Sequence, residues 1–519
     1  MKEVGFITGA VKQMEFNVLL ADRSIGRGSY LKIKHDVEGW VLTRIDTMKR
    51  YLDDFDEEKT QAKVRTIGFR DGVSVMTPKT PFNPNSKVYL ADEKLITSVL
   101  GLSKQRKGSI YLGLLEGHDI PVFLDADRLI EKHMSVLAKT GAGKSYTVAV
   151  IIEELMKTGT PIVIIDPHGE YGSLTMENDD YDSMQKYDVQ VHSYSDQLTE
   201  YAPNTSVNEN AKKLTLKADF TVMDLIEFMP IRLSDRQKGV LYSALDDMVE
   251  GAYTLTDLIK RIEEEPTRLK WKILEGLEAL QKSGVFDGKP VNYSDLVKPN
   301  RASIINMKGV DPHVQKLIVA KLTQDIYEQV TIGKLPKLFY LVEEAHNFCP
   351  ERGFGNVMSS NILRVIASEG RKFGFRLGVV SQRPARIDKN VLSQCNTQII
   401  LTVSNPNDLR AIGQSIEGFT SGMEDEIKDL RVGHSMVVGD CVEQPIVVDV
   451  RTRETMHGGK YVPKPHEELM EGRKINNNNK KKTILKKNIY NQGNQESLKH
   501  KIIRTFLSPF YDFSEEKDK

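Results

Sequence analysis

Residues 138–145 of this 519-residue chain, which read AKTGAGKS, restrict what it can fold into more than any other segment. An apolar run, residues 134–137, precedes them, and a helix-like run, residues 146–156, follows them. A strand, a tight glycine-containing loop and a helix in this order form the setting of a phosphate-binding P-loop. Backbone N–H groups of such a loop and of the helix N-terminus make a concave site for phosphate oxygens. The sequence therefore predicts a nucleoside triphosphate site.

The side chains of this loop predict the ligands more closely. Lys144 supplies a point charge for the β- and γ-phosphates, and the hydroxyl of Ser145 is a ligand for Mg²⁺. Ala138 stands where the usual pattern opens with glycine, so the first turn of the loop must use a negative φ. The alternative interpretation is a glycine-rich turn before an ordinary helix. We predict ATP and Mg²⁺ as cofactors, and nucleotide contacts from Thr140, Gly141, Ala142, Gly143, Lys144, Ser145 and Tyr146.

Two carboxylates follow a second apolar run. Residues 338–342 read LFYLV and lead directly into Glu343 and Glu344. Active sites of open α/β sheets lie at the carboxyl ends of the strands, so this pattern indicates a Walker B motif. We predict that Glu343 belongs to the Mg²⁺ shell and that Glu344 orients the attacking water. A strand that runs into an exposed acidic loop is the alternative.

Three further residues are candidates for the same site. Gln382 follows the apolar run 375–380, where a polar side chain can sense both the γ-phosphate and the attacking water. Arg371 is one of five arginines in this region, and we predict that it acts as a finger on the site of a neighbouring subunit. Asp166 ends the run 161–165, and either coordinates Mg²⁺ or water or caps the next segment.

Composition limits the possible partners and compartments. The chain has 72 basic and 72 acidic residues, so contacts to nucleic acid must come from local patches or from charges lining a pore. Cys349, Cys395 and Cys441 are too widely spaced to suggest a disulfide framework or a zinc site. No apolar run is long enough to span a membrane, and the N-terminus does not read as a signal peptide. We therefore expect a cytoplasmic protein with no membrane association.

The pattern of apolar runs predicts three regions and an α/β fold. Residues 1–90 read as short strands that close into a small β-barrel, with a charged, more helical segment near 47–63. Residues 91–455 alternate strands and helices, which is typical of a RecA-like P-loop ATPase core with a mainly parallel sheet. A helical insertion occupies about 180–300, and residues 456–519 form a C-terminal extension with a flexible basic segment.

Together these motifs resemble the HerA branch of the HerA/FtsK superfamily of hexameric DNA-pumping ATPases. The resemblance covers most of residues 1–460, and the β-rich start looks like the HAS barrel of that branch. The segments that carry it are residues 133–145, 166–171, 342–346, 369–374 and 381–384.

This resemblance implies a function and further site residues. It implies a homohexameric ring that uses ATP to translocate double-stranded DNA through a central pore. It also implies a role in processing double-strand break ends, with a NurA-type nuclease docked on the barrel. By the same resemblance, Lys132, His457 and Gly458 are expected near the nucleotide.

Two other functions compete with this one. A conjugation- or packaging-type DNA-pumping ATPase belongs to the same superfamily, although the chain shows a barrel and no membrane-spanning run. A scaffold that assembles on ATP and positions a nuclease needs no turnover. The presence of Glu344 and Gln382 favours real hydrolysis over the scaffold.

Overall fold

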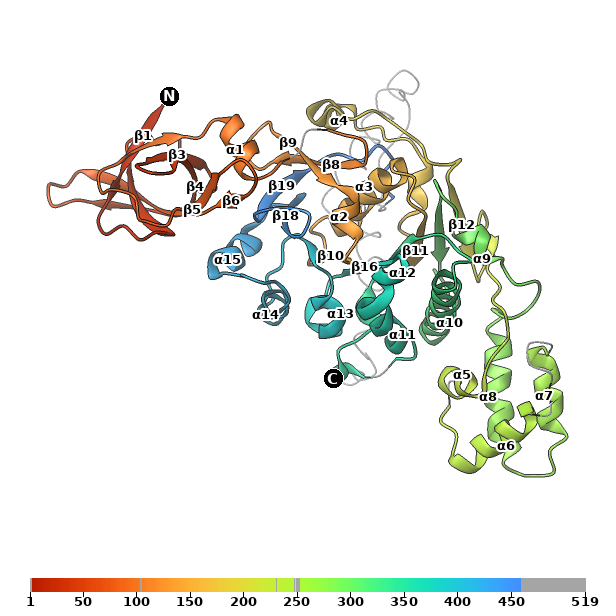
Figure 1. Ribbon diagram of the computed structural model, residues 1–519. Helices are drawn as coiled ribbons and strands as arrows, with labels where there is room; N and C mark the ends of the chain where they lie inside the picture. Colours follow the sequence, from red (N-terminus) through yellow and green to blue (C-terminus); the bar gives the residue numbers. More distant parts are fainter. Residues whose placement is uncertain are drawn as a thin grey trace, which may run out of the picture. The chain divides into compact units, whose positions relative to one another are not determined.

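The computed structural model describes residues 2–102, 105–229, 231–246, 248, 253–355 and 357–458. The basic segment predicted within the C-terminal extension, residues 473–487, lies outside the described residues. Two β-sheets organise the described chain, one of seven strands and one of twelve (Figure 1). No helix in the described part of the chain is long and apolar enough to cross a membrane.

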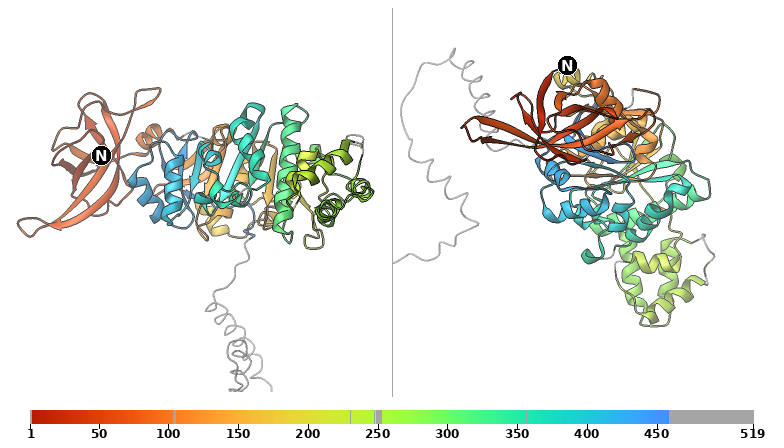
Figure 2. Two further views of the ribbon diagram at one scale, coloured as in Figure 1. Left: turned by 90° about the horizontal axis from the view of Figure 1, so that it is seen from below. Right: turned by 60° about the vertical axis from the view of Figure 1, so that its left-hand side comes forward.

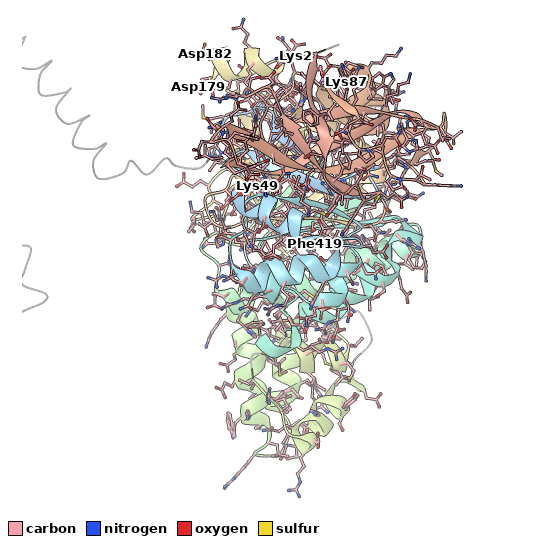
Figure 3. The ribbon with its side chains drawn as sticks, turned by 90° about the vertical axis from the view of Figure 1, so that its left-hand side faces the viewer. Lys2, Lys49, Lys87, Asp179, Asp182 and Phe419 are labelled. Carbon is pink, nitrogen blue, oxygen red and sulfur yellow. The ribbon has the colours of Figure 1, made fainter. Side chains whose placement is uncertain are left out.

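The first sheet is the predicted barrel. Six strands run in the order β2-β1-β7-β3-β4-β5, and β2 also pairs with β5, which closes the ring. Apolar residues fill its interior, whereas Lys2, Lys49 and Lys87 point outward from its surface (Figure 3). The strands are β1 (Glu3–Thr8), β2 (Glu15–Leu20), β3 (Tyr30–His35), β4 (Gly39–Leu52), β5 (Glu58–Arg70) and β7 (Lys87–Leu90), with β6 (Val75–Met76) added beside β5.

The helical segment predicted near residues 47–63 is wrong. This segment forms the end of β4 and the start of β5, which pair antiparallel out to Leu52 and Glu58. The last four residues of β4 are exposed, and residues 51–52 and 58–59 extend past the pairing of β5 with β2, so the tip of this hairpin is a two-stranded ribbon. Thr60 and Ala62 of β5 are still buried, and the charged residues of this segment lie on its outer face and at its tip.

The second sheet is the predicted core, and eight of its twelve strands are parallel. The order is β13-β12-β14-β11-β15-β16-β10-β17, followed by the antiparallel strands β18-β19-β8-β9. The parallel strands are β10 (Met134–Leu137), β11 (Ile162–Asp166), β12 (Leu198–Ala202), β13 (Lys212–Lys213), β14 (Ala302–Asn306), β15 (Leu338–Val342), β16 (Phe375–Ser381) and β17 (Thr397–Ile400). The antiparallel strands are β8 (Ser109–Leu115), β9 (Pro121–Asp125), β18 (His434–Gly439) and β19 (Ile446–Val450).

Helices cover both faces of this sheet. In β15, Tyr340 and Val342 pack into one apolar cluster, whereas Phe339 and Leu341 pack into another. The first cluster includes α10 (Pro312–Thr331), and the second includes α3 (Lys144–Lys157). Because neighbouring residues of a strand point to opposite faces, an unbroken apolar run is what a strand buried on both sides requires.

The insertion predicted at about 180–300 forms a group of helices only from Val222 onward, because β12 and β13 within those bounds belong to the core sheet. These helices lie on the side of the core that carries α10 (Figures 1 and 2). Thr221 and Asp224 form a reciprocal capping box at the start of one helix, and Thr254 and Asp257 form one at the start of another. The helices are α5 (Val222–Phe228), α6 (Asp235–Asp246), α7 (Leu255–Glu263), α8 (Lys270–Lys282) and α9 (Tyr293–Leu296).

The remaining α-helices are short and connect or flank the strands. Two of them, α11 and α12, lie between β15 and β16 in the chain. Their bounds are α1 (Glu93–Val99), α2 (Ala126–Ile130), α4 (Tyr181–Tyr187), α11 (Ser359–Val365), α12 (Arg371–Phe373), α13 (Lys389–Ser393), α14 (Pro406–Ser415) and α15 (Ser421–Asp429).

Candidate ATPase site

The loop between β10 and α3 has the backbone that the sequence predicts. Gly141 and Gly143 have φ values of 78° and 98°, whereas Ala138 is not among the residues with positive φ. The expectation that Ala138 fits the first turn is therefore confirmed. The Ala138 N–H donates to the carbonyl of Ser381 at 3.2 Å, and the Lys139 N–H donates to that of Thr402 at 2.8 Å. These two bonds hold the loop between the ends of β16 and β17.

Lys144 lies against both predicted Walker B carboxylates. Its Nζ donates to Glu343 Oε1 and, at 3.1 Å, to Glu344 Oε1. All three side chains are at least nine-tenths buried, so their charges interact with little screening by water. Glu344 has a φ of 49°, a left-handed conformation that is uncommon for a residue with a side chain. Such backbone strain gathers at functional sites.

Gln382 connects the P-loop to Glu344. Strand β16 lies between β10 and β15 in the sheet. Its end therefore lies between the strand end that leads into the P-loop and the strand end that leads into the two glutamates. The Gln382 Nε2 donates to Glu344 Oε1 at 2.7 Å, and the Thr140 hydroxyl donates to Gln382 Oε1. The structure thus brings these predicted residues into one hydrogen-bonded set.

Asp166 is close to the site but bonds to the backbone of its own loop. Its carboxylate accepts N–H bonds from His168, Gly169 and Tyr171 at 3.2, 2.8 and 3.2 Å. Complete burial raises the pKa of Asp166 even though these bonds favour its charged form. Of the two roles predicted for Asp166, the capping role is the one these contacts support.

Two residues of this loop reach the site although the sequence analysis did not select them. Glu170 accepts a hydrogen bond from the Ser145 hydroxyl, and the Tyr171 hydroxyl donates to Glu343 Oε2 at 3.0 Å. Burial raises the pKa of Tyr171 well above its usual range, so it remains a neutral donor. The signal was present in the motif DPHGEY, where an acid follows the strand end by four residues.

His346 is a third residue that the sequence analysis did not select. Its Nδ1 lies 3.0 Å from Ser381 Oγ and 3.2 Å from Glu344 Oε2. Burial lowers the pKa of His346, which outweighs the attraction of Glu344 for a proton. Glu344 Oε2 is itself buried without a hydrogen bond from any described residue. This oxygen therefore remains available to accept a hydrogen bond from a water.

The chain returns to the P-loop helix at residues 451–458. The rings of Tyr146 and His457 lie 5.4 Å apart, and the Tyr146 hydroxyl accepts the Arg453 N–H at 3.0 Å. An added Cβ on Gly458 would come within 2.6 Å of Ser173 Oγ, so this backbone lies close against the loop after β11. The predicted residues Tyr146, His457 and Gly458 are therefore near one another and near the start of α3.

Buried ion pairs fix this returning segment. The Arg451 guanidinium contacts Glu153 Oε2 at 3.1 Å and Glu154 Oε1 at 2.8 Å, with Glu454 at 3.5 Å. Glu153 also accepts the backbone N–H of Thr455 at 3.1 Å. Breaking one partner of such a buried network leaves an uncompensated charge, so the segment is held firmly along α3.

Two predicted residues lie away from the phosphate-binding loop. Lys132 precedes β10 at the opposite end of that strand, about 13 Å from the loop, and pairs with Asp440 at 2.8 Å. Its predicted contact with the nucleotide of its own subunit is not supported by this position. Arg371 is exposed before β16, about 20 Å from the strand end that carries Gln382. It therefore cannot reach its own site, and a contact with a neighbouring subunit stays a prediction.

Comparisons with known proteins agree with this geometry. Residues 110–326 match the family model described as Helicase HerA, central domain. The chain is 28% identical over 448 residues to the DNA double-strand break repair helicase HerA of Pyrococcus furiosus, covering 78% of this chain and 79% of that protein. It is 24% identical over 511 residues to the protein of the same name from Saccharolobus solfataricus, covering 92% and 97% of the two chains. The solved structure of VirB4 of Thermoanaerobacter pseudethanolicus covers 70% of this chain, with a TM-score of 0.49 and 14% identity.

The parallel sheet, the P-loop and the carboxylates at the neighbouring strand ends define the site of a P-loop ATPase. The chain is similar to HerA helicases: residues 110–326 match the model of their central domain, and these relatives match it over most of their length.

Proposed function

We propose that this protein is an ATP-driven translocase or helicase of double-stranded DNA, with the site around Lys144 as its motor centre. The observation that carries this proposal is the hydrogen-bonded set that joins Thr140, Gln382, Glu344 and Lys144. A protein that only binds ATP needs the loop and the lysine. A water-orienting glutamate and a polar residue that links it to the phosphate loop are needed for hydrolysis.

Each residue then has a role in phosphoryl transfer. The loop N–H groups and Lys144 bind the phosphates, and Glu344 holds the attacking water through Oε2, which accepts no hydrogen bond from a described residue. Gln382 connects the P-loop to Glu344, because it accepts a hydrogen bond from the Thr140 hydroxyl and donates one to Glu344. Because hydrolysis of ATP develops charge on the phosphate oxygens, an arginine from a neighbouring subunit, for which we propose Arg371, would stabilise the transition state.

The oxygen atoms near Ser145 fit a magnesium ion that arrives with the nucleotide. The described residues contain no group of three acidic, histidine or cysteine side chains that would hold a metal alone. Mg²⁺ is commonly bound by one or two protein oxygens together with substrate phosphates, which suits Ser145 and Glu343. Glu170, which contacts Ser145, is a better third candidate than Asp166. The ion would neutralise phosphate charge when bound.

The finer parts of the proposal come from the relatives. Several of them are named DNA double-strand break repair helicases. We propose that this chain likewise acts in the cytoplasm on DNA ends, as a homohexameric ring around double-stranded DNA and together with a NurA-type nuclease. Such a ring would allow Arg371 to contact the site of a neighbouring subunit, since its position is too far from the site of its own subunit.

ATP hydrolysis with and without double-stranded DNA tests the proposal, in the wild type and in Glu344→Gln. We expect hydrolysis that DNA stimulates and that Glu344→Gln abolishes, while the variant still binds ATP. Negligible hydrolysis by a wild type that binds ATP tightly would contradict a motor. It would favour the scaffold that assembles on ATP.

A further inference from the structure

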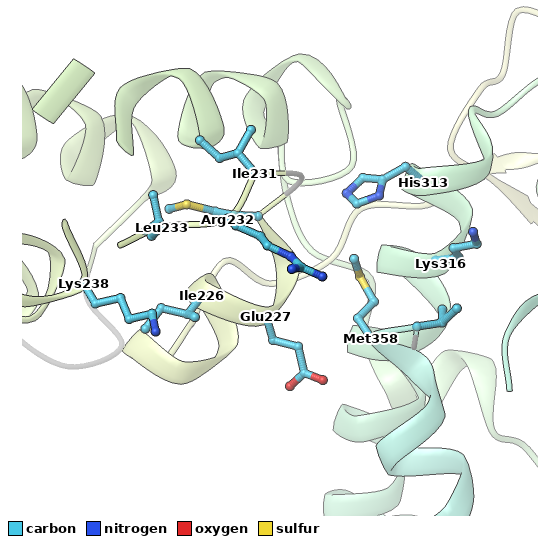
Figure 4. Close-up of a pocket in the computed structure, with 11 residues that line it drawn as sticks. Ile226, Glu227, Ile231, Arg232, Leu233, Lys238, His313, Lys316 and Met358 are labelled. Atoms are coloured by element: carbon cyan, nitrogen blue, oxygen red, sulfur yellow. The ribbon is translucent and has the colours of Figure 1, made fainter. Parts of the chain in front are cut away.

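A pocket of about 550 Å³ lies between the helical insertion and the ATPase core. One wall comes from α5 and the segment leading into α6, and the other comes from the first turn of α10 and residues 357–358. Figure 4 shows Arg232 reaching from the insertion toward His313 and Met358 on the core side. We call this the insertion pocket.

The insertion pocket presents positive charge that the described residues do not neutralise. Arg232 and Lys316 line it, and neither side chain has a hydrogen bond or ion pair with any residue that the structure describes. His313 Nε2 is buried there and also has no partner among these residues. Unpaired basic groups from two facing elements form a site for an anion.

The acidic groups nearby do not cancel this charge. Glu227 is the acidic residue of the lining, and its carboxylate accepts a hydrogen bond from Asn361 at 3.3 Å. Lys238 also lines the pocket and pairs with Asp235 at 2.9 Å. Glu227 offsets one of the two positive charges of Arg232 and Lys316, so the pocket keeps a net positive charge.

The position of the pocket connects it to the catalytic carboxylates. Strand β14 ends at Asn306 and α10 begins at Pro312, so the start of α10 lies near the carboxyl ends of the parallel strands. Glu343 and Glu344 directly follow β15 and lie at the same ends. Thirteen and fourteen residues after Glu344 along the chain, Val357 and Met358 form part of the pocket wall. An anion bound here would contact the segment that leaves the catalytic strand.

We propose that the insertion pocket binds the phosphate backbone of DNA, with Arg232 and Lys316 as the contacting residues. This inference rests on the proposed function, because double-stranded DNA is the polyanion that a translocase must hold. The described residues 345–355 and 357–358 then lie along the chain between bound DNA and Glu344. That segment accounts for how DNA would stimulate hydrolysis.

A second basic pocket, of about 520 Å³, supplies the matched control. It lies beside the edge strand β13, β12 and the residue that leads into β14, whereas Glu344 follows β15 in the interior of the sheet. Lysines on an edge strand commonly prevent pairing with other chains, which explains this cluster without a ligand. Lys289 and Arg301 line it, and both are exposed.

The test measures affinity for a fluorescent DNA duplex as a function of salt concentration. We compare the wild type with Arg232→Gln/Lys316→Gln and with the control Lys289→Gln/Arg301→Gln. Each lost phosphate contact lowers the slope of log K against log[salt] by about 0.9, so the first variant should lose about 1.8 for each engaged subunit. The control should keep the wild-type slope. Arg232→Lys/Lys316→Arg, which keeps both charges, should retain most of it.

Three results would overturn the proposal. An unchanged slope in Arg232→Gln/Lys316→Gln excludes these residues as contacts, and a loss confined to the control variant moves the contact to the second pocket. A slope that falls equally in the charge-keeping variant points to damaged packing. If the wild type itself fails to bind the duplex, the proposed function is wrong. That failure is distinguishable because it occurs before any residue is changed.

Discussion

Replacing Gln382 tests whether the link between the P-loop and Glu344, the glutamate that we propose orients the attacking water, matters for turnover. In Gln382→Ala the 2.7 Å bond from Nε2 to Glu344 Oε1 is lost, together with the bond from the Thr140 hydroxyl. A hydrogen bond to a charged group contributes about 1.5–3 kcal/mol. If this bond holds Glu344 in its hydrolytic position, kcat should fall by about 10- to 150-fold.

The binding of ATP should change much less than kcat in this variant. The loop N–H groups and Lys144 do not depend on Gln382 for their positions, because the loop is held by Ser381 and Thr402. Steady-state hydrolysis gives kcat and KM, and titration with a fluorescent ATP analogue gives Kd. Gln394→Ala, at an exposed glutamine after α13, is the matched control and should leave all three unchanged.

Thr140→Val isolates the other half of the link. It removes the hydroxyl that donates to Gln382 but leaves the bond between Gln382 and Glu344 intact, so its effect on kcat should be smaller. Two results would refute this reasoning: a Gln382→Ala enzyme with wild-type kcat, or one in which only Kd for ATP changes. In either case Gln382 would be a turn residue or a binding residue and would not position Glu344.

Two further predictions follow from backbone and burial. Gly143→Ala should lower the Tm and weaken ATP binding, since a side chain at φ 98° costs about 1–3 kcal/mol although the nearest atom to its Cβ is 3.6 Å away. The control Gly353→Ala, with open space and no positive φ, should be near neutral. Burial lowers the pKa of His133 from 6.5 to about 4, so the unfolded state binds more protons and stability should fall as pH drops through this window. Asparagine tolerates the φ of 61° at this position, so His133→Asn should fold and should not lose stability as the pH drops. Urea unfolding at several pH values measures this, and an equal loss of stability in the variant and the wild type would contradict the prediction.

The motor site could be predicted from the sequence because its parts lie at the ends of strands. Buried parallel strands read as continuous apolar runs, so Glu343, Glu344 and Gln382 could each be assigned to a strand end. Their meeting around Lys144 then follows from the sheet, since the strands share one direction. Adjacency in sequence was a poorer guide, as Lys132 shows: it precedes the same strand as the P-loop but lies at its other end.

Loop conformation set the limit of prediction at the site. Glu170 reaches Ser145 because three N–H bonds to Asp166 turn the chain back after β11. The sequence showed both acids, but it gave no means of deciding which would turn the loop and which would face the nucleotide. The ribbon formed by β4 and β5 escaped prediction for a related reason, because its exposed end lacks an apolar face.

The insertion pocket shows why zero net charge did not identify a DNA contact. Arg232 and Lys316 are separated by more than 80 residues, and each stands alone in a mixed stretch of the sequence. Packing of the insertion against α10 brings them to one cavity, whereas Lys238 of the same lining pairs with Asp235, and Lys298 of the second pocket pairs with Asp295. A binding surface depends on which charges remain unpaired after folding, and pairing is a property of the structure. For this chain, the unpaired cations near the end of the catalytic strand are therefore better guides to the DNA contact than total charge.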